Sequence, residues 1–400
     1  MMERCALKKV GKTNAFRIGL QMLLCVVVTS WPACFKAGKI NADDNDTVSE
    51  TNDGTDSDSD SESGSGESTD TGTGTLHQGQ HLRAIMGTGP NDIYAAGTCG
   101  LLLHFDGKKW NEVDLGVDGR LNAVWTIAQD NVLVGGESFD ECHSEDVSAH
   151  KGFIHHFDGS SWQKVYERSE DYSAIQSIWG ASPNDIYAGG DDYHQLHGSI
   201  NHFDGSSWLN ISAANIYPVC SIWDGQPQHI WGFSSGELYI YCREHDADDV
   251  WADLFYFPGR FNQECSIINL PSGYSSLSGR GSVWGSSPDD VFAVRDTGPI
   301  IYRFDGIKWS EMATGGVEGL LSIWGLGPKD VYAVGLDGQV LHYDGEAWNS
   351  MKANIAGDLL GVWGTKEAIY AVGDDNAKLP DEERSPAIYR YDGQSWKRVY

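Results

Sequence analysis

The sequence predicts an all-β fold, a seven-bladed β-propeller made of four-stranded antiparallel blades. The first observation is a repeated motif in which an aromatic residue precedes Asp-Gly and a Trp follows three residues after the Gly. The motif occurs six times, beginning at Phe105, Phe157, Phe203, Phe304, Tyr343 and Tyr391. The second observation is a Ser-Ile-Trp-Gly marker upstream of the motif, as in residues 177–180 and 322–325. A period of about 40 residues indicates a repeat fold in which each repeat is one supersecondary unit.

Each repeat contains four short runs that are typical of strands, separated by turn residues. In the sixth repeat, Pro328-Lys329-Asp330 is expected to turn the first strand into the second, because Pro fixes φ and Asp hydrogen-bonds the turn backbone. Asp344-Gly345 is expected to turn the third strand into the fourth, because Gly supplies the positive φ of a tight hairpin. Four antiparallel strands in each of seven repeats predict a propeller.

The fourth repeat departs from the pattern. We assign the seven first-strand markers to Met86, Trp125, Trp179, Trp223, Trp284, Trp324 and Trp363. The fourth repeat then keeps Trp251 as its fourth-strand Trp but has Tyr241-Cys242-Arg243 in place of the aromatic-Asp-Gly motif. The first strand begins near Leu82 and the last ends at Tyr400, so each blade is contiguous in sequence. Ring closure is therefore expected to rest on side-chain packing between blades one and seven.

The recurrent Trp and Asp residues are interpreted as structural. A large ring at the same place in every blade fills the wedge between neighbouring sheets. The alternative is a circle of exposed Trp side chains that stack on sugars. The repeated Asp is interpreted as a turn former. The alternative is a repeated calcium ligand, although one Asp per turn falls short of the six or more oxygens that Ca²⁺ takes.

The order of a Gly pair, an aromatic-Asp and then Trp resembles kelch-type propellers, with Gly135-Gly136 and Gly189-Gly190 as the Gly pairs. It also resembles secreted propeller lipoproteins of bacteria that carry repeated Val-Trp-Gly and Phe-Asp-Gly-x-x-Trp motifs behind a Ser/Asp-rich spacer. The resemblance covers roughly residues 82–400. Other repeats depart from kelch in having pairs such as Ala96-Gly97 and Val334-Gly335. The resemblance implies the fold and a surface location, and no single activity.

Residues 1–33 are interpreted as a signal peptide. Basic residues precede an apolar run over 18–28 that is too short to span a membrane. Pro32-Ala33 then leads to Cys34, which predicts cleavage before Cys34 and lipidation of its side chain. Trp31 stands where a bacterial lipobox usually has Leu, so a plain secreted protein and an uncleaved anchor remain alternatives. The protein is expected to be exported, as an outer-membrane or cell-surface lipoprotein or in secreted form.

Residues 34–75 are predicted to be a disordered tether rich in Ser, Asp, Thr and Gly, and residues 76–400 to form the propeller. The stretch 41–75 has no aromatic residue and no Lys or Arg, and its only aliphatic residues are Ala42 and Val48. Such a segment buries too little apolar area to offset its ordering entropy. A calcium-loaded acidic tail is the alternative interpretation.

The charge balance limits the classes of partner. Asp and Glu number 57 against 28 Lys and Arg, for a formal net charge of −29. This field repels phosphate backbones, so nucleic acid is not expected as a partner. An unknown protein or glycan at the cell surface is the expected partner, besides the membrane that holds the lipid anchor. No cofactor is predicted, with calcium as an alternative.

Strand polarity predicts which face of the propeller binds a partner. The one–two and three–four turns lie on one face, and the two–three loops and blade-to-blade links lie on the other. Insertions fall at 137–152, 191–198 and 374–386 in two–three loops and at 258–278 in a link, whereas a long three–four loop at 243–249 breaks the pattern. Binding residues concentrate in such loops. We therefore expect the two–three face to be the binding surface.

The inserted loops are polar and acidic. The candidate binding residues are Asp140, Glu141, His143, Asp191, Asp192, Tyr193, His194, His197, Asp374 and Asp375. Blades two and three are neighbours, so a metal site built from His143, His150, His194 and His197 is an alternative. No close ligand spacing of the kind found in metalloprotease motifs supports it.

The cysteines favour an oxidising compartment. Cys99 and Cys142 fall in two–three loops of adjacent blades and form a candidate disulfide. In the fourth repeat we expect Cys242 to pair with Cys265, with Cys220–Cys265 as the alternative.

We interpret the protein as a non-enzymatic cell-surface scaffold that binds a protein or mediates adhesion through its two–three face. A glycan-binding propeller is the alternative, motivated by Tyr193, Trp231 and the loops rich in Asp and Asn. A propeller glycoside hydrolase or lyase is a further alternative. No nucleophile motif and no apolar pocket signature supports an enzyme.

Overall fold

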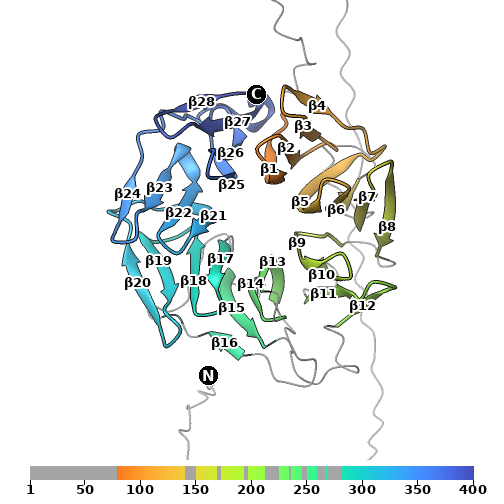
Figure 1. Cartoon of the computed structure of the whole chain (residues 1–400), viewed down its shortest axis with the longest axis horizontal. Coiled ribbons are helices and arrows are strands. Elements are labelled where there is room, and N and C mark those ends of the chain that lie inside the picture. The colour runs from red at the N-terminus through yellow and green to blue at the C-terminus, as the bar shows by residue number, and fades with distance from the viewer. Residues whose placement is uncertain are drawn as a thin grey trace, which may run out of the picture. The chain divides into compact units, whose positions relative to one another are not determined.

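Seven four-stranded antiparallel sheets surround a common axis in the computed structural model of the chain (Figure 1). The structure describes residues 79–139, 150–168, 173–192, 197–211, 225–233, 236–245, 250–258, 266–268, 270 and 281–400. The predicted signal peptide, Cys34 and the tether lie outside these ranges. No helix among the described residues is long and apolar enough to cross a membrane. The predicted seven-bladed β-propeller is confirmed.

Each blade is contiguous in sequence. Blades one to three comprise β1 (Leu82–Gly89), β2 (Asp92–Gly97), β3 (Leu102–Phe105), β4 (Trp110–Glu112); β5 (Gly119–Ala128), β6 (Asn131–Ser138), β7 (Lys151–Phe157), β8 (Trp162–Glu167); and β9 (Ser177–Ser182), β10 (Asp185–Asp192), β11 (His197–Phe203), β12 (Trp208–Asn210). Blades four and five comprise β13 (Gly225–Gly232), β14 (Leu238–His245), β15 (Val250–Phe257), β16 (Ser266–Ile268); and β17 (Gly281–Ser287), β18 (Asp290–Arg295), β19 (Ile300–Phe304), β20 (Trp309–Ala313). Blades six and seven comprise β21 (Leu320–Gly327), β22 (Asp330–Gly335), β23 (Val340–Tyr343), β24 (Trp348–Ser350); and β25 (Leu359–Thr365), β26 (Ala368–Asp374), β27 (Pro386–Tyr391), β28 (Trp396–Arg398), with 3-10 turns η2 (Leu336–Gly338) and η3 (Asp381–Glu383).

The aromatic-Asp-Gly motif forms the hairpin between the third and fourth strands. In all six copies the Asp Oδ1 accepts hydrogen bonds of 2.9–3.0 Å from the backbone N–H groups two and three residues later. The following Gly has φ between 84° and 96°, which favours glycine. The aromatic residue and the Trp face each other across the hairpin, as Phe105 and Trp110 do. The interpretation of the Asp as a turn former is confirmed.

The Ser-Ile-Trp-Gly marker joins neighbouring blades. Ser177 Oγ accepts a hydrogen bond from the backbone N–H of Ile230 at 2.9 Å, and Ser322 Oγ accepts one from the N–H of Val362 at 3.2 Å. The Trp of one blade lies over the marker Gly of the next in three pairs: Trp179 and Gly232, Trp284 and Gly325, and Trp363 and Gly87. These three Trp side chains are 3–4% exposed. They fill the wedge between sheets, as predicted, and the Gly is required because a Cβ would occupy the space of the indole.

Blade four corrects our assignment of its strands. Its first strand β13 contains His229-Ile230-Trp231-Gly232, so Trp231 occupies the marker position that we assigned to Trp223. Trp223 lies outside the described residues and is followed by Asp224. Since the Trp179 indole packs on Gly232, the Trp-Gly pair rather than Ser-Ile-Trp identifies the strand.

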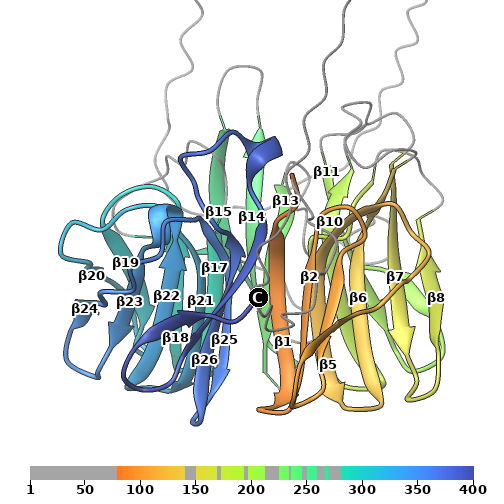
Figure 2. The ribbon, with the colours of Figure 1, turned by 90° about the horizontal axis from the view of Figure 1, so that it is seen from above.

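This shift moves every later element of blade four. Tyr241 belongs to the second strand β14, and Trp251 belongs to the third strand β15 instead of the fourth. The connection from His245 to Val250 therefore joins the second strand to the third, and the exception that we predicted at 243–249 is removed. The predicted link 258–278 is interrupted by β16, so that its first part is a three–four loop. Figure 2 shows the β14–β15 and β26–β27 ends on the same upper face.

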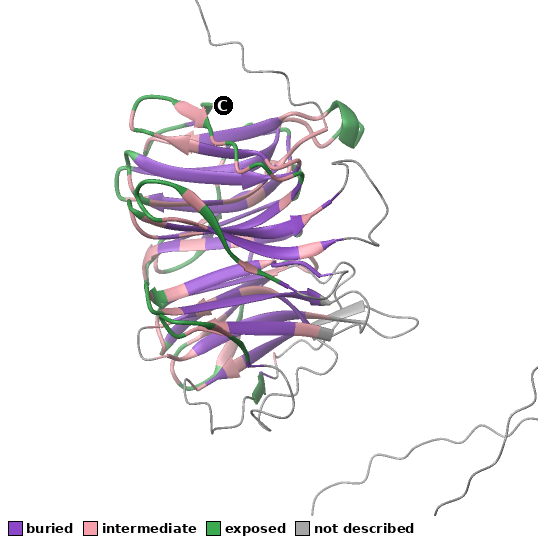
Figure 3. Ribbon diagram, turned by 90° about the vertical axis from the view of Figure 1, so that its right-hand side faces the viewer, coloured by how far each residue is buried: buried purple, intermediate pink, exposed green. Residues whose placement is uncertain are grey.

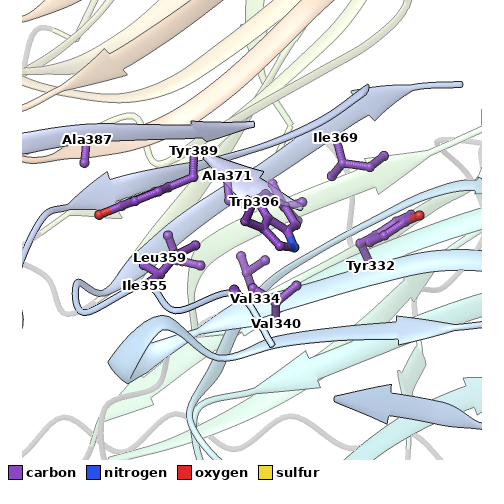
Figure 4. Close-up of a cluster of buried hydrophobic side chains, with 12 residues drawn as sticks. Tyr332, Val334, Val340, Ile355, Leu359, Ile369, Ala371, Ala387, Tyr389 and Trp396 are labelled. Atoms are coloured by element: carbon purple, nitrogen blue, oxygen red, sulfur yellow. The ribbon is translucent and has the colours of Figure 1, made fainter. Parts of the chain in front are cut away.

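Blades one and seven close the ring without sharing a strand. Leu82, Ile85 and Ile93 of blade one pack with Trp363 and Tyr370 of blade seven in one buried cluster. Buried residues run through the middle of every blade, and the exposed residues lie at the turns and on the outer strands (Figure 3). Figure 4 shows the equivalent cluster between blades six and seven. The predicted closure by side-chain packing is confirmed.

Candidate functional site at the central channel and the two–three face

Five of the ten predicted binding residues lie outside the part of the chain that the structure describes. These five are Asp140, Glu141, His143, Tyr193 and His194. For Asp192 and His197 only the strand backbone is described. These assignments stay predictions. The three described candidates are Asp191, Asp374 and Asp375, and all three make contacts within the propeller.

Asp191 is the second-last residue of β10 and is 1% exposed. Its two carboxylate oxygens accept hydrogen bonds of 2.9 Å from the side-chain amides of Gln176 and Gln228. Arg243 of blade four lies 3.8 Å away and also donates to Gln226. Asp191 is therefore a buried carboxylate that joins blades three and four. It holds two amides at the inner edge of the two–three face.

Asp374 and Asp375 anchor the two–three loop of blade seven. Arg384 Nη1 lies 3.3 Å from Asp374 and 3.5 Å from Asp358, and Arg384 also donates to the backbone carbonyls of Leu379 and Ala377. Burial raises the pKa of Asp374. Asp375 accepts from Arg398 at 3.2 Å. Arg384 thus lies inside the loop to which it belongs, and its contacts hold η3 on the two–three face (Figure 2).

His150, one member of the alternative metal site, is 1% exposed and its Nδ1 lies 3.2 Å from the buried carboxylate of Glu137. Its ring also packs on Phe139 at a centroid distance of 4.2 Å. Within the described ranges, no group of three or more His, Cys, Asp or Glu residues is arranged to hold a metal ion. The contact of its Nδ1 with Glu137 makes His150 part of a buried pair with a residue of β6.

The cysteine predictions have different outcomes. Cys99 lies in the two–three loop of blade one, and its predicted partner Cys142 lies outside the described residues, so this pairing stays a prediction. Cys242 is a thiol in the structure, 0% exposed and packed with Ile240 and Phe255. The predicted Cys242–Cys265 disulfide is therefore wrong for this structure. The corrected strand assignment is the reason, because it moves Cys242 into the middle of a buried second strand.

A second repeated contact was not predicted from the sequence. The Asp that begins the second strand lies 2.7–2.8 Å from a His in the third strand in three blades: Asp92 with His104, Asp185 with His202, and Asp330 with His342. Each His ring stacks on a Tyr of the second strand, as His104 does on Tyr94 at 4.2 Å. The signal was available, because His directly precedes the aromatic-Asp-Gly motif in these repeats. Its recurrence makes the pair a structural element rather than a catalytic one.

The first strands of all seven blades enclose a central cavity of about 200 Å³. Each first strand starts at a blade-to-blade link, so its beginning lies at the two–three face and its end at the opposite face. Arg83, Gln176 and Gln228 each lie three residues before the marker position of their blade and form the mouth of the cavity. Met86, Trp231 and the other marker residues lie deeper. The cavity therefore opens toward the two–three face.

Three Trp side chains form the deep end of the cavity. Trp231 contacts Trp125 at a centroid distance of 6.2 Å and Trp324 at 5.7 Å, both edge to face. These residues belong to blades two, four and six, which are not neighbours, so their rings meet across the axis. Trp324 Nε1 donates to the Gly364 carbonyl at 3.1 Å. Trp231, which motivated the glycan alternative, thus lies in the channel floor and not on a surface loop.

The cavity carries little charge. Among the described residues that line it, none is acidic, and only Arg83 and His229 are ionisable cations. Burial lowers the pKa of His229 to about 4, so the imidazole is neutral at pH 7. The chain as a whole has a formal charge of −29. The channel is therefore a weakly charged, partly aromatic site within an acidic protein.

Comparison with known proteins supports the fold alone. No protein-family model matches the chain, and no similar curated protein was found. Similar solved structures include YCF48 bound to D1 peptide (TM-score 0.54, 14% identity, 75% of this chain and 93% of that chain). They also include the WD40 β-propeller domain of Doa1 (0.50, 12%, 79% and 94%) and U3-55K (0.51, 10%, 74% and 88%).

The chain has a β-propeller fold with WD40-like structural neighbours. At identities of 10–14%, these likenesses show architecture and carry no activity across. The resemblance to kelch-type and lipoprotein propellers is confirmed only at the level of the fold.

Proposed function

We propose that this protein is a non-enzymatic scaffold that binds another protein on its two–three face, around the mouth of the central channel. The observation that supports this is that the polar side chains of Gln176 and Gln228 line this mouth, at a position where blade seven has Leu360. Residues that recur in most blades maintain the ring, whereas a position whose side chain differs between blades can serve recognition. The neighbours that are described as peptide-bound or as WD40 domains agree with this proposal.

A binding role fits the polar groups of this face better than catalysis. Asp191 and Asp374 are buried and hydrogen-bonded to groups of the propeller itself. A glycoside hydrolase needs carboxylates that converge on a substrate with one of them held ready to donate a proton. Asp191 instead holds the side-chain amides of Gln176 and Gln228, and Asp374 holds the two–three loop of blade seven through Arg384. These contacts preorganise the two–three face.

We further propose that the scaffold is displayed outside the cell, tethered by residues 34–75 to a lipid on Cys34. The support is the sequence: basic residues, a short apolar run and a small-residue site precede Cys34. An oxidising location also suits the proposed Cys99–Cys142 disulfide. Replacement Cys34→Ala is expected to move the protein from the membrane fraction to the soluble fraction. Unchanged membrane association of this variant would refute the lipid anchor.

The binding face is tested by photo-crosslinking in the native host. A photoreactive amino acid replaces Lys378, an exposed residue in the blade-seven two–three loop, or Ile307, which is 89% exposed in a three–four turn on the opposite face. We expect specific protein adducts from position 378 and none from position 307. Adducts from position 307 alone would place binding on the other face and contradict the proposal.

A further inference from the structure

We propose that the central channel is a socket for a single uncharged, apolar side chain of the protein partner. This inference rests on the proposed function, because the side chain belongs to a protein that is held on the two–three face. The argument uses the size of the cavity, the chemistry of its wall and the groups at its mouth.

The cavity has the size of one residue. Its volume of about 200 Å³ lies below the roughly 300–1,000 Å³ of pockets that hold drug-sized ligands. The floor closes it, since the Trp125, Trp231 and Trp324 rings are in contact across the axis. A ligand therefore enters and leaves by the mouth at the two–three face. An extended chain cannot pass through, but one side chain can be inserted.

The wall selects an apolar group. Half-buried Met86 and the three indoles supply the deeper surface, and half-buried Leu360 adds apolar surface at the level of the mouth. No carboxylate is found among the described lining residues, so an inserted Lys or Arg head group would lose its hydration without gaining a partner. The deeper wall also offers no cation to a carboxylate, because Arg83 lies at the mouth and His229 is neutral at pH 7, its pKa held near 4 by burial.

The mouth supplies polar groups for the backbone that carries the side chain. The amide nitrogens of Gln176 and Gln228 are held by Asp191 at 2.9 Å. Their side-chain oxygens accept no hydrogen bond within the described part of the chain, so both remain as acceptors for a backbone N–H. An apolar floor beneath fixed polar acceptors matches a polypeptide segment that presents one large side chain.

The socket is tested on the full-length protein with single-residue probes, observed by saturation-transfer NMR. The probes are the N-acetyl amides of Phe, Leu, Asp and Lys. Leu360→Trp fills the cavity at a position outside the buried core clusters. Leu209→Trp makes the same chemical change on the outer strand β12, where Leu209 is 41% exposed, and serves as the matched control.

We expect saturation transfer to the Phe and Leu probes, its loss in Leu360→Trp and its retention in Leu209→Trp. Equal transfer to the Asp or Lys probe would overturn the proposed selectivity. Retention of Phe binding in Leu360→Trp would show that the probe sits elsewhere, and absence of transfer to every probe would also overturn the proposal. Repeating the position-378 crosslink in Leu360→Trp separates the two proposals: unchanged adducts leave the binding face intact and reject the socket.

Discussion

Trp284 of β17 lies directly over Gly325 of β21, so the Trp of one blade occupies the place that a side chain at the marker Gly of the next blade would take. Trp284 is 4% exposed and also packs near Phe292 of its own blade. Through this contact, the Trp of one Trp-Gly marker packs on the Gly of the next marker across a blade boundary. It explains why Trp and Gly recur together.

Gly325→Ala is expected to destabilise the propeller by about 1–3 kcal/mol, because the added methyl group overlaps the indole in a closely packed interface. The measurement is the midpoint of chemical unfolding. Gly327→Ala is the control, since a Cβ there meets nothing within 4 Å. Equal effects of the two substitutions would show that backbone entropy, and not the Trp contact, requires the glycine.

Acid unfolding is expected to depend on the hairpin Asp residues. Hydrogen bonds from a Ser side chain and from backbone N–H groups lower the pKa of Asp158 and Asp204 to about 2. Because the folded pKa lies below the unfolded value of about 3.9, the contribution is complete above pH 4 and is lost as the pH falls from about 4 to about 2.

The double substitution Asp158→Asn with Asp204→Asn should therefore flatten the fall in stability between pH 4 and pH 2. Chemical unfolding at a series of pH values measures it. Glu346→Gln, at an exposed hairpin position, should leave the slope unchanged. A double variant with the wild-type slope would mean that other carboxylates control acid unfolding.

Arg384→Ala is expected to release the blade-seven two–three loop. It leaves the carboxylate of Asp374, which is 3% exposed, without its cation, and breaking such a buried pair costs roughly 3 kcal/mol or more. Hydrogen exchange should accelerate over 374–386 and remain slow in β21. Adding Asp374→Asn should restore part of the stability, and failure of this rescue would argue against charge burial as the cause.

Asp191→Ala is expected to lower the free energy of unfolding by about 1–3 kcal/mol, because the side-chain amides of Gln176 and Gln228 lose their acceptor. Thermal unfolding measures the loss, and Glu318→Ala, at an exposed site, is the control. A near-wild-type melting profile for Asp191→Ala would show that Asp191 is accessible to solvent or ligand, as the loop pattern first suggested.

Local chemistry made the fold predictable. Phe105, Asp106 and Gly107 specify a hairpin through a cross-strand ring contact, an Asp acceptor and a positive φ, and these effects act within a few residues. The same local signal located five of the other six blades. It failed in blade four. There Trp223 ends a Ser-Ile-Trp sequence, but Trp231 precedes the Gly on which the Trp179 indole packs.

The candidate site was less predictable because its contacts are long-range. Asp191 reads as a loop residue in sequence, yet the neighbouring blade buries it against Gln228. The His104–Asp92 contact joins two strands of one blade. The repeated His and Asp can be seen in the sequence, but neither forms part of a turn motif that would indicate their contact.

The sequence by itself determined the repeat, its hairpins and the number of blades, because each depends on residues that are close in the chain. Only the tertiary structure decided that Trp125, Trp231 and Trp324 meet on the axis. That contact joins three blades that are not neighbours, and it exists only once the ring has closed. The physical reason is that hydrogen bonds and φ angles are set locally, whereas the shape and charge of a central cavity depend on every blade at once.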